Sequence, residues 1–155
     1  KDSKPFYHHT EIGYNYRMSN VLAAIGVGQM EAIEDRIKRT REVNQIYRKE
    51  VGNLFYSFQE ERETDRSNMW LTCALMKGED KPEDLIKHLA EDNIEARRLW
   101  KPMHEQPVMK GYTKYINGNS SLLFLQGICL PSGSDLTNKD MKRIIKSIKT
   151  FFKKW

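Results

Sequence analysis

Few cysteines and no long apolar run are the first features of this sequence. Its 155 residues include two cysteines, Cys73 and Cys129, each in an apolar segment and far from any paired-cysteine spacing. This pattern excludes a cysteine zinc site and predicts two buried free thiols in a reducing compartment. No apolar run reaches the roughly 18 residues that span a bilayer. We therefore expect a cytoplasmic protein that binds no membrane.

The sequence motifs of common catalytic sites are also absent. The chain has no glycine-rich phosphate loop and no His-Glu-x-x-His helix. Gly26 and Gly28 do not form a dinucleotide-binding fingerprint with Gly13, because they fall within a predicted helix that no strand precedes. The adjacent His8 and His9 point in different directions on any regular element, which argues against joint metal ligation. We predict no catalytic residue and no metal ligand in this chain.

The composition is typical of a folded, basic domain. Charged residues make up 30% and hydrophobic residues 39%, and the formal net charge is +5. Much of the basic excess lies in the last predicted helix, where cations on a solvated face complement the helix dipole. The chain opens at Lys1 without an initiator methionine, so we expect a start inside a longer polypeptide.

The hydrophobic pattern predicts a long first helix. Ser19 is a suitable N-cap, and apolar residues recur at three- and four-residue spacing up to about Glu50. A helix over residues 19–50 would be roughly 45 Å long, which suits a spine between two parts of a larger protein. Residues 13–17 form a polar and aromatic loop at its entrance. Such a loop suits a ligand site at a helix terminus or a subunit interface.

The remaining sequence alternates short strands and helices. Strands are predicted over residues 69–76, where a nearly continuous apolar run indicates a central strand, and over 94–97 and 128–130, and residues 55–59 form either a strand or an irregular segment. Helices are predicted after a capping signature at residues 80–83, with Asn93 in the left-handed position that follows the helix, over 120–127, and from a cap at Thr137. Two prolines make residues 97–108 an ordered loop. The last helix carries an apolar stripe that predicts core packing: Met141, Ile144, Ile145, Ile148, Phe152 and Trp155. We expect a mixed α/β fold with a sheet of three or four strands flanked by helices.

Three motifs, in this order, resemble one enzyme family. They are Gly13-Tyr14-Asn15-Tyr16-Arg17-Met18-Ser19-Asn20, Arg98-Leu99-Trp100-Lys101-Pro102-Met103-His104, and Leu130-Pro131-Ser132-Gly133. Together they resemble the pyridoxal-phosphate-dependent nucleotide-sugar aminotransferases of the DegT/DnrJ/StrS type. The resemblance covers essentially the whole chain, but only the C-terminal portion of such an enzyme, because the family's Schiff-base lysine lies upstream of the first motif. It implies a linking segment and cofactor-phosphate loop at residues 1–18. Residues 19–155 would then be the small domain of a fold type I aminotransferase.

The resemblance implies a cofactor site in the first motif. In the family, the asparagine that matches Asn15 reaches into the neighbouring subunit and hydrogen-bonds the phosphate of pyridoxal 5'-phosphate. An amide donor at a helix entrance suits that role, and a turn or capping role is the alternative. Arg17 is either a second anion contact or part of an ion pair at the dimer interface. That homodimer interface is expected over residues 13–30.

The second motif is expected to line the substrate side of the active site. An indole among cations favours a surface that binds phosphates and rings, and the alternative is that Trp100 and Met103 close the edge of the core while the basic side chains face solvent. Arg98 departs from the family, which commonly has proline there. The resemblance implies substrate-binding roles for six residues: His9, Tyr16, Arg97, Trp100, Lys101 and His104.

The activity that the resemblance implies is the transfer of an amino group from glutamate to a nucleotide-linked keto sugar. The expected sugar is a 4-keto-6-deoxyhexose, and the expected setting is surface-glycan synthesis without a nucleic-acid partner. Net charge, with Trp100 and Tyr112 among cations, supports a different class, a stand-alone basic module that binds nucleotides or RNA. A non-catalytic member of the same family is the third alternative.

Overall fold

The computed structural model describes residue 12 and residues 14–153, which form two compact units divided between Glu34 and Asp35. His9 and Gly13 of the predicted site, and Trp155 of the predicted stripe, lie outside the described residues. The domain boundary predicted at residue 18 stays a prediction.

The predicted first helix is divided in two at Ala32. Helix α1 (Asn20–Glu31) has the expected cap, because the Ser19 hydroxyl accepts a hydrogen bond from the Leu22 amide at 3.3 Å. It ends where the Ala32 amide donates to the Gln29 carbonyl at 3.3 Å, a contact that tightens the last turn. Helix α2 (Ile33–Val51) follows. The prediction of one unbroken helix over residues 19–50 was therefore wrong, since the chain forms helices of 12 and 19 residues.

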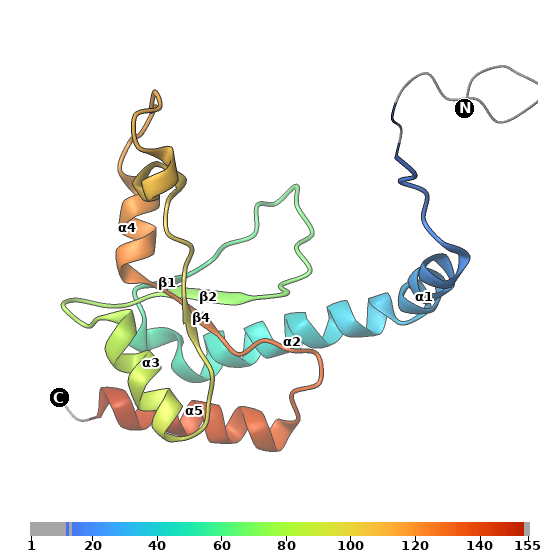
Figure 1. The fold of residues 1–155 in the computed structure, drawn as a ribbon. Helices are drawn as coiled ribbons and strands as arrows, with labels where there is room; N and C mark the ends of the chain where they lie inside the picture. The colour runs from blue at the N-terminus through green and yellow to red at the C-terminus, as the bar shows by residue number, and fades with distance from the viewer. Residues whose placement is uncertain (1–11, 13, 154–155) are drawn as a thin grey trace, which may run out of the picture. The chain divides into compact units, whose positions relative to one another are not determined.

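The second unit is built on a small antiparallel sheet (Figure 1). Its strands are β1 (Ser57–Phe58), β2 (Thr72–Leu75), β3 (Arg97–Arg98) and β4 (Gly127–Leu130), in the order β1-β2-β4-β3. The mixed fold with a sheet of up to four strands is confirmed, and β2 is central as predicted. Strand β2 is shorter than the predicted segment 69–76, and β3 overlaps the predicted segment 94–97 only at Arg97, whereas β4 begins one residue earlier than predicted. Met69 has a φ of 49°, outside the β region, so β2 begins only at Thr72.

Three further α-helices complete this unit: α3 (Pro82–Glu91), α4 (Asn119–Gln126) and α5 (Asn138–Phe152). Short 3-10 turns cover Gly52–Leu54 (η1), Met103–Glu105 (η2) and Pro107–Met109 (η3). Of the capping signature expected at residues 80–83, Pro82 and Glu83 lie in the first turn of α3, but no side-chain cap forms, because the N-cap residue Lys81 makes no side-chain hydrogen bond. Asn93 takes the predicted left-handed conformation after α3, with a φ of 54°. Across the described residues, no helix is long and apolar enough to cross a membrane.

Helix α5 begins with the predicted capping box. Thr137 and Asp140 exchange hydrogen bonds between side chain and backbone in both directions. Hydrogen bonds from the Thr137 side chain and then from its backbone lower the pKa of Asp140. Hydrogen bonds between residues close in sequence thus fix where α5 begins, and this determines which side chains of its apolar stripe face the core.

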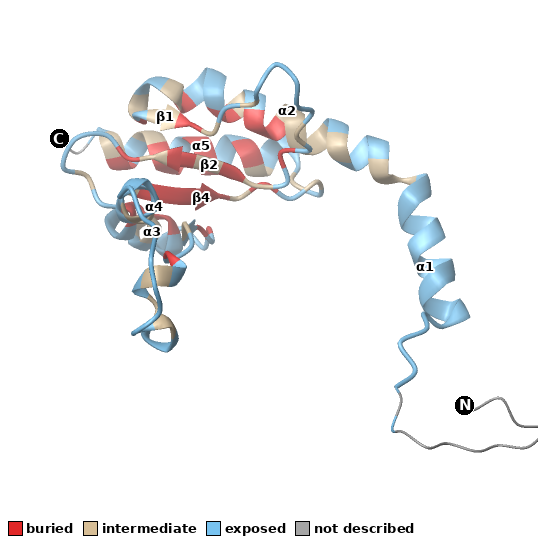
Figure 2. Cartoon of the chain, turned by 90° about the horizontal axis from the view of Figure 1, so that it is seen from above, coloured by how far each residue is buried: buried red, intermediate tan, exposed pale blue. Residues whose placement is uncertain are grey.

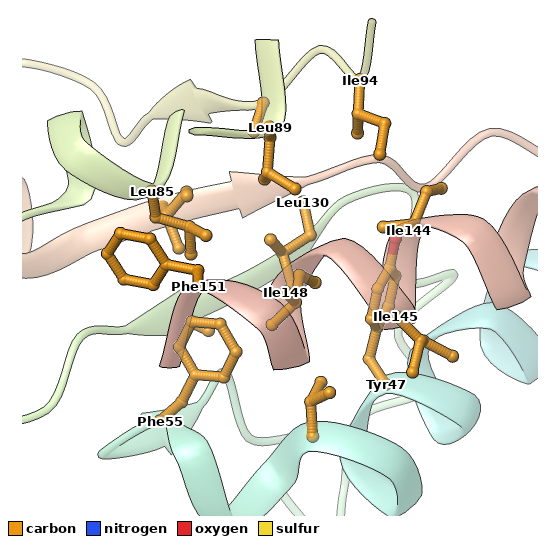
Figure 3. Close-up of a cluster of buried hydrophobic side chains, with 14 of the residues drawn as sticks. Tyr47, Phe55, Leu85, Leu89, Ile94, Leu130, Ile144, Ile145, Ile148 and Phe151 are labelled. Atoms are coloured by element: carbon orange, nitrogen blue, oxygen red, sulfur yellow. The ribbon is translucent and has the colours of Figure 1, made fainter. Parts of the chain in front are cut away.

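The core lies between the sheet and the helices α2, α3 and α5 (Figure 2). Leu85 and Leu89 of α3 point toward α5, and Tyr47 of α2 points toward Ile144 and Ile145 (Figure 3). Met141, Ile144, Ile145 and Ile148 of the predicted α5 stripe are buried. Phe152 is only half-buried, and its neighbour Phe151 is buried instead. The fully buried aliphatic side chains include Leu85, Leu89, Ile128 and Ile148.

The third motif holds this core to the sheet. The Tyr47 hydroxyl donates to the Pro131 carbonyl at 2.8 Å, and burial raises the pKa of Tyr47. The Ser132 hydroxyl accepts from the Thr72 amide at 2.7 Å and donates to the Leu130 carbonyl at 2.7 Å. Both serine and threonine are buried, so these bonds satisfy polar groups that would otherwise be costly. The motif therefore has a structural role at the end of β4.

We predict that Ile148→Ala lowers the free energy of unfolding by about 2–5 kcal/mol, because Ile148 is fully buried between α5 and the sheet. Ile116→Ala removes the same atoms from a side chain that is 60% exposed and is expected to change stability by less than about 0.5 kcal/mol. Urea denaturation followed by circular dichroism measures both. Equal effects of the two substitutions would contradict the assigned core.

Candidate functional site

The loop before α1 contains a local turn built by Asn15. Its Oδ1 atom accepts a hydrogen bond from the Arg17 amide at 3.0 Å, which is the turn role considered as the alternative for this residue. With Oδ1 engaged, the amide nitrogen is the part of the side chain that suits an anionic ligand, because it carries two donors. Tyr14 and Tyr16 lie with ring centroids 5.9 Å apart, and all four side chains are exposed.

Helix α1 has an apolar surface, but its side chains do not pack into a buried core. No residue of α1, all of which the structure describes, is buried. Each large apolar side chain left in water forgoes about 1.5–3 kcal/mol of burial free energy, and contiguous apolar surfaces of this kind mark interaction sites. The exposed apolar residues of the loop and helix are Ile12, Tyr14, Tyr16, Met18, Val21, Leu22, Ile25, Val27 and Met30.

The second motif begins in the edge strand β3 and continues over the surface. Arg97 pairs with Glu95 at 2.6 Å, and both side chains are more than two-thirds exposed, so this ion pair is weak and its arginine can exchange partners. Trp100 is 66% exposed, and Lys101 is also exposed. The alternative in which Trp100 closes the core edge is therefore wrong. These side chains form an open, cationic and aromatic surface.

Arg98 is the exception among the basic residues of this motif. Its Nη2 atom donates to the Phe124 carbonyl at 2.5 Å, and its guanidinium carbon lies 4.1 Å from the centroid of the Phe124 ring. Its Nη1 atom pairs with Glu83 of α3. Arg98 therefore ties together β3, α3 and α4, and the alternative of a solvent-facing base is wrong for this residue.

His104 lies in a small polar cluster at η2. Its Nε2 atom is 3.3 Å from the Ser121 hydroxyl and 3.7 Å from Oε1 of Glu105. The same hydroxyl donates to Glu105 at 2.5 Å, so Ser121 on α4 fixes both side chains of η2. Sequence reasoning missed Ser121 and Glu105. No local signal marks them, because Ser121 is 17 residues from its histidine partner.

His104 also lines a pocket of about 320 Å³. Its other walls come from η2, from the segment after η3 and from the start of α4, and they include Met103, Tyr112, Tyr115 and Ser120. Aromatic and polar lining groups of this kind suit a ring-bearing, hydroxylated ligand. Of the predicted substrate residues, only His104 lines this pocket among the residues that the structure describes, whereas Arg97, Trp100 and Lys101 occupy open surface.

The predicted cofactor residues Asn15 and Arg17, with Tyr16, belong to the first unit, whereas Arg97, Trp100, Lys101 and His104 belong to the second. Within the described part of the chain, no three histidine, cysteine or acidic side chains cluster as a metal site would require.

A family model matches residues 1–149 of this chain. The chain belongs to the DegT/DnrJ/EryC1/StrS aminotransferase family. The resemblance drawn from the three sequence motifs is thereby confirmed. Enzymes of this family depend on pyridoxal phosphate.

Curated relatives agree with this assignment. EpsN of Bacillus subtilis, provisionally named a pyridoxal phosphate-dependent aminotransferase, is 39% identical over 96% of this chain and 41% of its own length. The GDP-perosamine synthase of Escherichia coli O157:H7 is 36% identical over 94% of this chain and 40% of its own length. The chain thus spans about two-fifths of the length of these relatives.

Solved structures show the same fold. Helicobacter pylori PseC, an aminotransferase involved in the biosynthesis of pseudoaminic acid, superposes with a TM-score of 0.82 at 17% identity, over 100% of this chain and 43% of that chain. This likeness confirms the fold of a family whose enzymes are fold type I aminotransferases.

Close packing at Gly127 holds α4 against the strand that carries the second motif. A Cβ atom on Gly127 would lie 2.0 Å from Cδ1 of Leu99 and 2.3 Å from the Leu123 carbonyl oxygen. The carbonyl belongs to the backbone of α4, so a side chain here must displace the helix that carries Ser121.

We predict that Gly127→Ala destabilises the protein by about 1–3 kcal/mol, because overpacking forces the backbone to move. Gly52→Ala is the matched control, since its Cβ would meet nothing within 4 Å and its φ is not positive. Thermal unfolding measures both variants. A Gly127→Ala protein as stable as the Gly52→Ala protein would contradict the close contact.

Proposed function

We propose that this protein is a pyridoxal-phosphate-dependent aminotransferase that aminates a keto sugar linked to a nucleoside diphosphate. The observation that carries the proposal is the family match over residues 1–149. The name of the relative GDP-perosamine synthase supports a nucleotide-linked sugar as substrate. We infer a 4-keto-6-deoxyhexose as acceptor, glutamate as amino donor, and a role in surface-polysaccharide synthesis. We prefer this function to a nucleic-acid module, because the match accounts for the whole folded region rather than for net charge alone.

The first motif is proposed to hold the cofactor phosphate of the neighbouring subunit. Asn15 offers an amide donor just before α1, and Arg17 adds a guanidinium two residues later. The engagement of Oδ1 in the turn supports this role, because it orients the amide as a donor rather than an acceptor. Bound pyridoxal phosphate supplies the electron sink that amino transfer needs, and these two side chains bind and orient it.

The second motif is proposed to bind the nucleotide sugar. Its exposed Lys101 and the exposed Arg97 directly before the motif suit the diphosphate, and Trp100 offers a face on which a base or sugar ring can stack. His104 is held by Ser121 and Glu105 at the wall of a pocket, which suits a hydrogen bond to a sugar hydroxyl. His9 and Tyr16 keep the substrate-binding roles that the sequence predicts for them.

The protein is proposed to act as a cytoplasmic homodimer joined through residues 13–30. The unburied apolar surface of α1 supports such an interface, because a second copy would cover side chains that this unit leaves exposed. The free thiols of Cys73 and Cys129 support a reducing compartment.

The direct test of the activity uses glutamate labelled with ¹⁵N on its amino group. The native protein, pyridoxal phosphate and a panel of nucleoside-diphosphate 4-keto-6-deoxy sugars are incubated together, and products are analysed by mass spectrometry. We expect ¹⁵N in an amino sugar and 2-oxoglutarate in equal amount. A protein that binds the cofactor but transfers no label to any sugar of the panel would contradict the proposal and favour a non-catalytic member of the family.

We predict that Asn15→Ala weakens retention of pyridoxal phosphate by about 10- to 100-fold, the worth of one hydrogen bond to a charged group. Cofactor absorbance after dialysis against graded pyridoxal phosphate measures this. Asn117→Ala is the matched control, because Asn117 builds the same turn, with Oδ1 accepting from the Asn119 amide at 3.1 Å. Loss of a turn of this kind at Asn117, away from the proposed cofactor site, should therefore leave cofactor affinity unchanged. Equal retention by both variants would remove Asn15 from the cofactor site.

We predict that Leu22→Asp dissociates the homodimer, because it would bury a charge in the interface assigned to α1. Leu125→Asp makes the same change at a comparably exposed leucine on α4, at 62% against 59% exposure, and should leave the dimer intact. Analytical ultracentrifugation at several protein concentrations distinguishes them. A dimer that survives Leu22→Asp with unchanged affinity would place the interface elsewhere.

A further inference from the structure

Two cysteines face each other across the two central strands of the sheet. Cys73 of β2 is the direct partner of Cys129 of β4, and their sulfur atoms lie 3.7 Å apart. Thr72 and Ala74, the neighbours of Cys73, are buried on the core side. Because side chains alternate along a strand, the two thiols lie on the opposite face of the sheet. Both are reduced in the structure.

The backbone places this pair in the register that permits a cross-link. The Cys73 carbonyl accepts from the Gln59 amide at 3.1 Å, and the Cys73 amide donates to Oε1 of Gln59 at 2.6 Å. Both backbone groups of Cys73 thus point toward the β1 side. Cys73 and Cys129 therefore form a non-hydrogen-bonded pair, in which Cα atoms are about 4.5 Å apart. That separation lies within the roughly 4.4–6.8 Å that disulfides span.

The position of Arg97, the cross-strand partner of Cys129 in β3, favours Cys129 as the nucleophile of the pair. A hydrogen bond from Cys73 lowers the pKa of Cys129, burial opposes that shift, and the positive charge of Arg97 adds to the lowering. The same hydrogen bond and then burial raise the pKa of Cys73. Cys129 is therefore assigned as the sulfur that reacts first, because a thiolate attacks peroxides faster than a thiol does.

A pocket beside the pair gives small molecules access to Cys73. It has a volume of about 280 Å³, and its walls include Cys73, Leu75, Leu99 and Leu123. Cys73 is half-buried and Cys129 retains 8% exposure beside it, so the pair favours a small oxidant over a bulky one.

The geometry points to Cys73 and Cys129 as a site of reversible oxidation by peroxides, independent of amino transfer. The Cys129 thiolate attacks one oxygen of hydrogen peroxide, the O–O bond breaks, and the released hydroxide takes a proton to leave as water. The sulfenic acid formed on Cys129 is then attacked by the Cys73 sulfur, which loses its proton as a second water leaves. In sum, two thiols and one peroxide give one disulfide and two waters, a two-electron oxidation that a thiol reductant reverses.

The test follows these two cysteines by peptide mapping in the intact native protein exposed to graded hydrogen peroxide, with free glutathione in the same solution as the comparator. We expect both thiols to become unavailable to a maleimide together, at peroxide concentrations that leave most of the glutathione reduced. We also expect a peptide pair linked through Cys73 and Cys129, with a loss of about 2 Da relative to the two thiol peptides. Dithiothreitol should restore both thiols.

Two serine variants test the assigned order. Cys73→Ser keeps the thiolate at Cys129, which should form a sulfenic acid trapped by dimedone. Cys129→Ser removes the assigned nucleophile and the cross-link, and leaves Cys73, whose pKa burial still raises, so it should react more slowly than Cys129 does in Cys73→Ser. Three outcomes would overturn the proposal: thiols that stay reduced until glutathione is consumed, separate oxidation of each cysteine without a link, or linkage of either cysteine to a different partner. The first two can be judged on the unmodified protein alone, so the conclusion does not depend on the folding of a variant.

Discussion

The packing of the α5 stripe against the central strands is the interaction on which the second unit depends. All four residues of β4 are buried, and Ile144 and Ile148 of α5 lie in the same core as Ile128 and Leu130. A sheet with two-residue edge strands has little stability of its own, because it needs an apolar face packed against helices. The packing of α5 holds β4 in place, and β4 in turn pairs with the edge strand β3. The position of the motif that we assign to the nucleotide sugar therefore depends on this packing, because that motif begins in β3.

The first unit shows the opposite situation. Helix α1 has good caps and regular hydrogen bonds, yet its apolar side chains have no core within the unit. Tertiary packing rather than propensity supplies most of the stability of a short helix, so α1 needs a surface to pack on. The loop that we propose to hold the cofactor phosphate directly precedes it, with the Ser19 cap between them. In the proposed dimer, a subunit contact that covers α1 would also position Asn15 and so couple assembly to cofactor binding.

Sequence patterns predicted the parts of the fold that local chemistry fixes. The stripe of α5, its capping box, the left-handed Asn93 and the central position of β2 each follow from neighbouring residues, and the structure has them. The break at Ala32 was not predicted, because no glycine or proline marks it. In the same way, periodicity over residues 94–97 indicated a full strand, whereas hydrogen bonding to β4 limits β3 to two residues.

The same distinction between local and long-range contacts applies to the site residues. The family motifs pointed to Asn15 and His104, but nothing local pointed to Ser121, which reaches His104 only because α4 folds back on η2. A solvent-facing base was one alternative for Arg98, and its stacking on Phe124 depends on a contact 26 residues away in sequence. Cys73 and Cys129 lie opposite each other because of the register between β2 and β4, and the two apolar runs in the sequence do not by themselves specify that register.

The central claim is that the loop before α1 belongs to a cofactor site completed by assembly. Hydrogen–deuterium exchange of the native protein, with pyridoxal phosphate bound and after its removal, tests this most directly. We expect the amides of residues 14–31 to exchange more slowly in the cofactor-bound form, while the core helix α5 is protected equally in both. Exchange of residues 14–31 at the same rate in both forms, with the cofactor shown to be bound, would contradict it.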